Sequence, residues 1–276
     1  YQGRQGCQGC PARRRCIKAI ALLKKPLLKS GFFYACYSLP LMNPVKPLPL
    51  FDPRAIPVMG NDSHLAGVAL DRLTPQALRE RFLHPPVWMP EHSVEKSFSN
   101  RQPALAAVLL PLVMRDELTL LLTERSANVS THSGQIAFPG GRTDDTDQDA
   151  VHTALREAQE EIALPPQHVE VLGTLPTYVT GTAFIITPVV ALVRPGFQLQ
   201  PNPGEVADVF EVPLAYLMNP AHHRRHETEF DGVLRQWLSM PYTDPVSEAA
   251  GSELKERYIW GATAGMLRNF YRFLSA

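Results

Sequence analysis

Three glutamates, Glu157, Glu160 and Glu161, are the residues of this 276-residue chain whose type and spacing point most directly to chemistry. They lie in the stretch 148–162, whose apolar residues recur at helical spacing and predict an amphipathic helix. At about 100° per residue, the three carboxylates share one arc, roughly 120° from the centre of the apolar stripe. We therefore expect three carboxylates on one helix face, beside the core.

Carboxylates at this spacing oppose helix formation unless something neutralises them. Pairs at i, i+3 and i+4 repel by a few tenths of a kcal/mol, and the helix dipole disfavours negative charge near a C-terminus. A hard divalent cation reverses the sign of this effect, because Mg²⁺ takes oxygen ligands and is commonly held by carboxylates together with substrate phosphates. The alternative is a solvated acidic face with Arg156 as its neutralising neighbour.

The residues upstream of this helix favour the metal interpretation. Phe138-Pro139-Gly140-Gly141 ends a strand-like segment and leads through an acidic loop into the helix. Glycine lets backbone approach a phosphate closely, and a loop that precedes a helix is a natural site for a pyrophosphate. We therefore expect a pyrophosphate to bind beside Gly140 and Gly141.

The stretch 141–164 resembles the Nudix box, G-x5-E-x7-R-E-U-x-E-E-x-G-U with U apolar. The match lies in the second half of the box, which reads Arg-Glu-Ala-Gln-Glu-Glu-Ile-Ala-Leu here. Arg156 stands 15 positions after Gly141, where the box has 14. Gln148 occupies the place of the first Glu, and Ala163 that of the final Gly.

The loop between Gly141 and Arg156 is one residue longer than in the box. In this respect the chain resembles the coenzyme A pyrophosphatase branch of the Nudix hydrolases. That branch carries an upstream signature, L-L-T-x-R-(S/A)-x3-R-x3-G-x3-F-P-G-G, which begins here at Leu121 and includes Arg125, Ser126 and Gly134. Ser130 stands where the signature has its second Arg. If that Arg binds the coenzyme A phosphates, its replacement changes affinity or substrate choice.

Two later motifs extend the resemblance to about residues 70–274. They are Asn-Pro-Gly-Glu-Val at 202–206 and Ile-Trp-Gly-Ala-Thr-Ala at 259–264. The resemblance implies a Nudix-type α/β/α sandwich with a mixed sheet. It also implies hydrolysis of the pyrophosphate of coenzyme A and its derivatives to adenosine 3′,5′-bisphosphate and 4′-phosphopantetheine. Mg²⁺ or Mn²⁺ is the implied cofactor, since a carboxylate-held ion polarises phosphoryl oxygens and activates water.

The resemblance also assigns roles to residues. Glu157 and Glu161 are implied as the principal metal ligands, and Glu160 as a third ligand or a water-mediated partner. Arg156 is implied to orient these carboxylates. Glu205, on a later loop, is implied to close on the site as a further ligand or the general base, with a solvated loop residue as the alternative.

Substrate binding is expected at Arg125, Ser126, Gly140 and Gly141. For Arg125, a strand-end arginine paired with Glu124 or with another nearby acid is an equally good interpretation. Two other functions remain open. One is a Nudix hydrolase of another nucleoside diphosphate derivative, such as ADP-ribose or a dinucleotide, and the other is a non-catalytic Nudix-like module, which the retained carboxylates disfavour.

Other residues with chemical potential have plainer explanations. His222, His223 and His226 could suggest a metal site, but their flanking arginines favour a solvated surface segment. Trp260 is expected in the core rather than as a stacking platform for adenine. The single Cys-x-x-Cys pair that begins at Cys7 is a weak zinc signal, because no second pair matches it.

The net charge of zero is an average over two unlike parts. Residues 1–41 carry eight basic residues, no acidic residue and all four cysteines, whereas residues 42–276 have a charge of −8. Met42 is the first methionine and is expected to be the true start, with a targeting segment as the alternative. Six prolines at 40–57 predict a linker or an extended arm. We thus expect an N-terminal extension over 1–57 and a Nudix domain over 70–276.

Composition narrows the partners and the compartment. No apolar run approaches the roughly 18 residues of a membrane span. The acidic charge of residues 42–276 leaves no electrostatic footprint for nucleic acid. We expect a cytoplasmic monomer or homodimer that acts on a small molecule, with no membrane or nucleic-acid partner.

The elements that must position the carboxylates alternate between strand and helix. The chain is expected to form helices over 74–83 and 258–274, a hairpin from 104–114 and 118–123, and strands over 169–174, 184–193 and 209–212. Interleaved strands and helices indicate a layered α/β domain with a mixed sheet.

Overall fold

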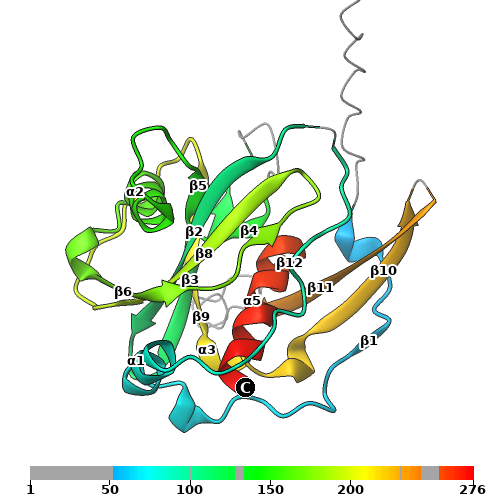
Figure 1. Cartoon of the computed structure of the whole chain (residues 1–276), viewed down its shortest axis with the longest axis horizontal. Helices are drawn as coiled ribbons and strands as arrows, with labels where there is room; N and C mark the ends of the chain where they lie inside the picture. The colour runs from blue at the N-terminus through cyan, green and yellow to red at the C-terminus, as the bar shows by residue number, and fades with distance from the viewer. Residues whose placement is uncertain (1–51, 100, 128–133, 231, 244–254) are drawn as a thin grey trace, which may run out of the picture. The chain divides into compact units, whose positions relative to one another are not determined.

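The computed structural model describes residues 52–99, 101–127, 134–230, 232–243 and 255–276 (Figure 1). The chain divides into two units, Tyr1–Asn43 and Pro44–Ala276, and every described residue belongs to the second. The expectations for Cys7 and Met42, and for Ser130 in the upstream signature, fall outside the described residues.

A mixed main sheet forms the centre of the second unit, as the sequence predicts. Its eight strands are β2 Ala104–Met114, β3 Leu118–Arg125, β4 Ile136–Ala137, β5 Gly140–Arg142, β6 Val169–Thr174, β7 Tyr178–Val179, β8 Phe184–Val193 and β9 Val206–Pro213. The order is β4-β3-β2-β8-β6, with β5 on β2, β7 on β8 and β9 on β3. Strands β2 and β8 run parallel, and the other pairs are antiparallel. The long apolar run of β2 suits this position, because a parallel pair at the centre of a sheet is buried on both faces.

Helix α2 (Ala150–Ile162) covers one face of this sheet. Asp149 caps it by accepting a hydrogen bond from His152 N at 2.8 Å, so the helix begins two residues later than predicted. Ala154, Ala158 and Ile162 are buried against residues of β2, β3 and β8. Small side chains at two of these positions let the helix backbone lie close to the sheet, which brings its glutamates near the strands.

The opposite face is covered by helices α5 (Gly261–Ser275), α1 (Pro75–Leu83) and α3 (Leu214–Leu217). The predicted helix over 74–83 is confirmed, with Thr74 Oγ1 accepting from Ala77 N and Pro75 in the first turn. Four short 3₁₀ segments complete the helical structure of the described part: Pro53–Ala55, Leu70–Arg72, Pro166–His168 and Pro220–His222. Helices on both faces of the mixed sheet give the expected α/β/α sandwich.

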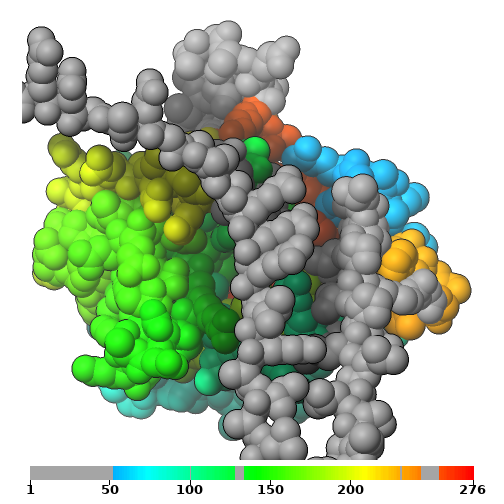
Figure 2. Space-filling model, turned by 90° about the horizontal axis from the view of Figure 1, so that it is seen from above, coloured from blue at the N-terminus to red at the C-terminus, as the bar shows by residue number. Residues whose placement is uncertain are grey.

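A second sheet, absent from the sequence prediction, lies beyond α5. Its four antiparallel strands, in the order β1-β10-β11-β12, are β1 Gly60–Asn61, β10 Arg224–Phe230, β11 Val233–Thr243 and β12 Glu256–Trp260. Figure 2 shows the hairpin β10–β11 on the opposite flank of this unit from the segment around α2, with the arm that contains β1 beside the hairpin.

The predicted helix over 258–274 is wrong at its start. Residues up to Trp260 belong to β12, in which Ile259 pairs with Met240, and the helix begins only at Gly261. Gly261 has a φ of 61°, a conformation that favours glycine and allows the abrupt change from strand to helix. Within the described residues, no helix has the length and apolarity required to cross a bilayer.

Candidate active site

Two of the predicted metal ligands on α2 pack directly against the glycine strand β5. The side chain of Glu161 is 4% exposed, and its Oε2 accepts a hydrogen bond from Gly140 N at 3.1 Å. A Cβ built on Gly141 would lie 2.5 Å from Oε2 of Glu157. Gly140 has a φ of 155°, and a Cβ there would lie 2.5 Å from Ala107 O. A side chain at either position would clash with its neighbours, so both positions require glycine. These two glycines, which were expected to bind phosphate, lie beside the carboxylates.

Arg156 links the glutamates of α2 to one another. Its Nη1 donates to Glu157 Oε1 at 2.9 Å and to Glu160 Oε2 at 3.0 Å. Glu157 is mostly buried, with a 16% exposed side chain, whereas that of Glu160 is 57% exposed. The arginine is thus bonded to the carboxylates that it was expected to orient, and it holds Glu160 on the solvent side.

Asp147 is a site residue that the sequence interpretation missed. Its two carboxylate oxygens accept from Nε and Nη2 of Arg156 at 2.9 and 2.8 Å, and its side chain has no exposed surface. Arg156 and the backbone N–H of Asp144 hold the pKa of Asp147 well below its usual range. The sequence did contain a signal for Asp147. When the Nudix box is aligned on Gly141, its first acidic position falls at residue 147. When it is aligned on Arg156, that position falls at Gln148, which is exposed.

Glu205 approaches the same carboxylates from the loop before β9. Ser126 N donates to Glu205 O at 2.8 Å, and the next residue, Val206, pairs with Arg125 at the end of β3. The charge of Glu205 raises the pKa of both Glu157 and Glu161, so it lies within electrostatic reach of both.

Burial governs the electrostatics of this cluster. It raises the pKa of Glu161 to about 7, with Glu157 and Glu205 adding repulsion while Gly140 N and Arg125 oppose the rise. Burial also raises the pKa of Glu157, against the effect of Arg156. A cluster of carboxylates with too little compensating positive charge favours the binding of a cation.

The donor set fits Mg²⁺ or Mn²⁺, although the ligands are not already assembled. Within the described ranges, no three His, Cys, Asp or Glu side chains converge on a point that could hold a metal ion. Arg156 explains part of this, since it binds both Glu157 and Glu160. Mg²⁺ commonly keeps several waters and takes one or two carboxylates plus substrate phosphates. Glu157 and Glu161 can supply those carboxylates.

Arg125 lies at the end of β3 and points to the carboxylates. Its Nη1 is 3.8 Å from Glu161 Oε1, and its buried Nε has no hydrogen-bond partner among the described residues. Glu124 instead binds Arg257 at 3.0 Å and Lys255 at 2.8 Å, because successive strand residues face opposite sides of a sheet. Arg125 therefore pairs with a nearby acid other than Glu124, and its buried nitrogen is suited to an anionic ligand.

Comparison with known proteins identifies the family. The sequence model of the NUDIX domain family matches residues 103–235 of this chain. The chain is 42% identical over 173 residues to the uncharacterized Nudix hydrolase NudL of Cronobacter sakazakii, over 62% of this chain and 82% of the relative. It is 40% identical over 174 residues to NudL of Escherichia coli K12, over 63% and 82%. The chain belongs to the Nudix hydrolase family.

Solved Nudix structures align with part of this hydrolase. An Ap4A hydrolase of C. elegans matches with a TM-score of 0.35 at 20% identity, over 43% of this chain and 85% of that chain. The NUDIX domain of Shewanella oneidensis NrtR, complexed with ADP ribose, matches with a TM-score of 0.33 at 25% identity, over 42% and 75%. Nudix hydrolases are pyrophosphohydrolases that act on small molecules and generally use divalent metal ions such as Mg²⁺.

The histidines of this Nudix hydrolase are not the solvated segment that the sequence predicted. His223 and His226 are 0% and 3% exposed. His223 Nε2 lies 2.8 Å from Leu217 O, and its Nδ1 lies 3.1 Å from Nη1 of Arg268. Burial lowers the pKa of His223 to about 4. The prediction failed because Arg225, read as a sign of exposure, pairs with acidic residues distant in sequence.

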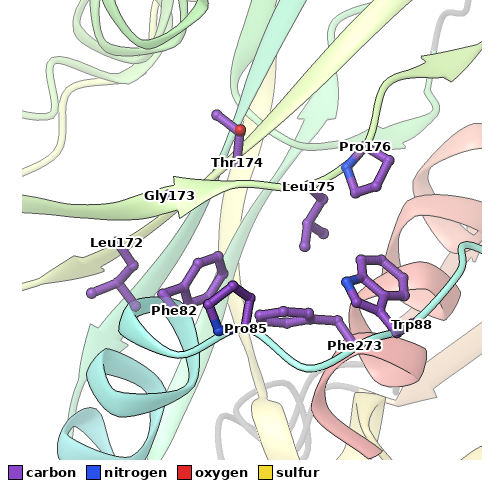
Figure 3. A pocket seen from close by; sticks show the side chains of 9 residues that line it. All are labelled: Phe82, Pro85, Trp88, Leu172, Gly173, Thr174, Leu175, Pro176 and Phe273. Atoms are coloured by element: carbon purple, nitrogen blue, oxygen red, sulfur yellow. The ribbon is translucent and has the colours of Figure 1, made fainter. Parts of the chain in front are cut away.

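Two further features are Trp260, which was expected in the core, and a cavity that no predicted site residue lines. Trp260 is half-buried at the end of β12, next to α5. A separate cavity of about 400 Å³ lies between α1, β6 and α5, and Figure 3 shows Phe82, Trp88 and Phe273 along it. None of the predicted site residues lines this cavity, and none of the described residues along it is acidic or basic. It is therefore not part of the phosphate chemistry of the Nudix site.

Proposed function

We propose that this Nudix enzyme hydrolyses the pyrophosphate bond of coenzyme A and its derivatives with a divalent cation, Mg²⁺ or Mn²⁺. The products would be adenosine 3′,5′-bisphosphate and 4′-phosphopantetheine or its acyl form. The observation that supports this proposal best is the 3.8 Å approach of Arg125 to Glu161. It brings the arginine of the coenzyme A signature to the carboxylates of the Nudix box, although the two motifs are separate in sequence.

A pyrophosphate diester carries negative charge that must be neutralised before water attacks phosphorus. A bound divalent cation supplies a Lewis acid for the phosphoryl oxygens and lowers the pKa of a coordinated water. Glu157 and Glu161 would hold it, and Glu160 would join through a water or after release from Arg156. Asp147 would keep Arg156 in place during this exchange.

The other residues would act on the substrate itself. Arg125 would use its buried Nε to bind a phosphate, and the backbone at Gly140 and Gly141 would allow the pyrophosphate to approach the carboxylates. Ser126, buried next to Arg125, would line the same subsite. Glu205 would take the proton of the attacking water. Fixed positions and charges of this kind supply most of the rate in phosphoryl chemistry.

A second candidate substrate class is favoured by Ser130. This residue replaces the second Arg of the coenzyme A signature, so a nucleoside diphosphate derivative without the 3′-phosphate, such as ADP-ribose or a dinucleotide, is the alternative.

A substrate panel tests the proposal. The full chain would be incubated with coenzyme A, an acyl-coenzyme A, ADP-ribose and a dinucleotide, each with Mg²⁺ and with Mn²⁺, and the products identified by mass spectrometry. Release of 4′-phosphopantetheine, abolished by Glu161→Gln, is the expected result. Turnover of ADP-ribose alone would replace the proposed substrate by the alternative, and no turnover with either metal would refute both.

A further inference from the structure

The loop that carries Glu205 is attached to the last turn of α2. Asn202 N donates to Glu161 O at 2.8 Å, and Gln200 N donates to Ile162 O at 3.0 Å. Both acceptors are carbonyls at the C-terminus of the helix, where no intrahelical partner remains. The loop thus satisfies the backbone of the helix end that presents Glu161, and its position depends on that helix.

Asn202 then organises the turn that follows. Its backbone oxygen accepts from Glu205 N at 3.0 Å and from Val206 N at 2.8 Å, and its side-chain Oδ1 accepts from Gly204 N at 3.1 Å. Asparagine at the first position of a β-turn and proline at the second are the residues that such a turn favours, and the side-chain bond closes an Asx turn. Every one of these bonds ends on Asn202.

The side-chain bond adds to these backbone bonds by restraining Gly204, in the middle of the turn. Among the described residues, a Cβ on Gly204 would meet only Asn202 Oδ1, at 3.3 Å. Glu205 itself is exposed. On the other side, the turn is fixed by Ser126 N to Glu205 O, next to an irregularity in the pairing of β3 with β9. Such irregularities re-aim side chains near active sites.

We propose that Asn202 is a positioning residue, whose carboxamide fixes the 202–205 turn so that the Glu205 carboxylate faces Glu157 and Glu161. This inference rests on the proposed function in one respect, since it takes Glu205 to act at the site of the divalent cation. Asn202 touches neither substrate nor cation and acts through Glu205 alone.

The test compares variants of the full chain in two assays. The variants are Asn202→Ala, Asn202→Asp, Glu205→Gln and the double variant Asn202→Ala/Glu205→Gln. Mn²⁺ affinity is titrated by electron paramagnetic resonance without substrate, and kcat and KM are measured with whichever nucleoside diphosphate derivative is turned over. Asn219→Ala is a matched control, because Asn219 Oδ1 accepts from Ala221 N at 3.1 Å in a similar turn that contains none of the site residues.

Asn202→Ala is expected to weaken Mn²⁺ binding and to lower kcat, each by about fivefold, which is the effect of losing one hydrogen bond, with KM unchanged. Asn202→Asp keeps the acceptor and should restore both values. In the Glu205→Gln background, Asn202→Ala should cause no further loss. Asn219→Ala should leave Mn²⁺ affinity and kcat at the wild-type values.

Either of two results would overturn the inference: wild-type Mn²⁺ affinity and kcat in Asn202→Ala, or an equal loss with and without Glu205. The proposed function fails separately. It fails if Glu157→Gln and Glu161→Gln leave turnover intact. In that case the Mn²⁺ titration would still test the role of Asn202. A general loss of folding would appear as a lowered Tm that Asn202→Asp does not rescue, and that result would also count against a positioning role.

Discussion

Gly141→Ala is expected to displace the carboxylate of Glu157 while leaving the stability of the fold nearly unchanged. The φ of Gly141 lies outside the left-handed region, so alanine fits its backbone. A Cβ at this position would lie 2.5 to 2.7 Å from the three carboxylate atoms of Glu157. Ordinary contacts begin near 3.5 Å, so the carboxylate must move by roughly 1 Å.

In the role proposed for Glu157, a displacement of this size would cost about a hundredfold in rate, which corresponds to about 2.7 kcal/mol of transition-state stabilisation. We therefore expect Gly141→Ala to lower kcat by about that factor and to change the free energy of unfolding by less than about 1 kcal/mol. Turnover with saturating Mg²⁺, together with thermal unfolding of the same sample, measures the two effects.

Gly67→Ala is the matched control. A Cβ at Gly67 meets its nearest atoms at 3.7 Å, which is ordinary contact, and its φ also lies outside the left-handed region. It should change neither kcat nor Tm. If Gly141→Ala kept more than half of the wild-type kcat, the carboxylate of Glu157 would not need its observed position, and the role assigned to it would be refuted.

Three further outcomes follow from the structure. Asp147→Asn should lower kcat, because Arg156 loses its enclosed ionic partner, while Asp145→Asn, at an exposed position of the same loop, should not; turnover assays compare the two. Ala163→Gly should raise Tm by about 2 °C, because Ala163 has a φ of 55° in the left-handed region. The strain that glycine relieves exceeds the entropy that it adds to the unfolded chain by up to about 1 kcal/mol. A lower Tm by calorimetry would contradict this. The pKa of His223 is about 4 in the folded chain and near 6.5 in the unfolded chain. Its contribution to the free energy of unfolding, up to about 3 kcal/mol, is therefore present above pH 6.5 and lost as pH falls towards 4. Denaturant titrations should show that the free energy of unfolding depends more steeply on pH in the wild type than in His223→Gln over this range.

Local periodicity was sufficient for the elements whose residues contact one another along the chain. The apolar stripe of α2 follows from short-range pattern, and so do the bounds of β2, β6 and β8, which agree with the predicted ranges. The cap at Asp149 was not predicted. These elements bury a continuous apolar face, so their sequence pattern is strong.

Long-range pairing decided the elements that were predicted incorrectly. The apolar residues that precede Gly261 suit a helix as well as a strand, and only the pairing of Ile259 with Met240 selects the strand. His223 was predicted to be solvated from its charged neighbours. It is buried, with Arg268, 45 positions away, beside its Nδ1, and its neighbour Arg225 binds Asp62 and Glu91, 163 and 134 positions away. No local pattern reveals these contacts.

The sequence by itself determined that Glu157, Glu160 and Glu161 share one helix face and that glycines precede that helix, because helical geometry and the freedom of glycine are local properties. Only the tertiary structure decided which groups meet those carboxylates. Arg125 comes from the end of one strand and Glu205 from a loop fixed to the helix C-terminus, while Asp147, which the sequence interpretation had not singled out, binds Arg156. Their approach depends on strand pairing and on backbone hydrogen bonds between distant segments, and these form only when the sheet and α2 are packed together.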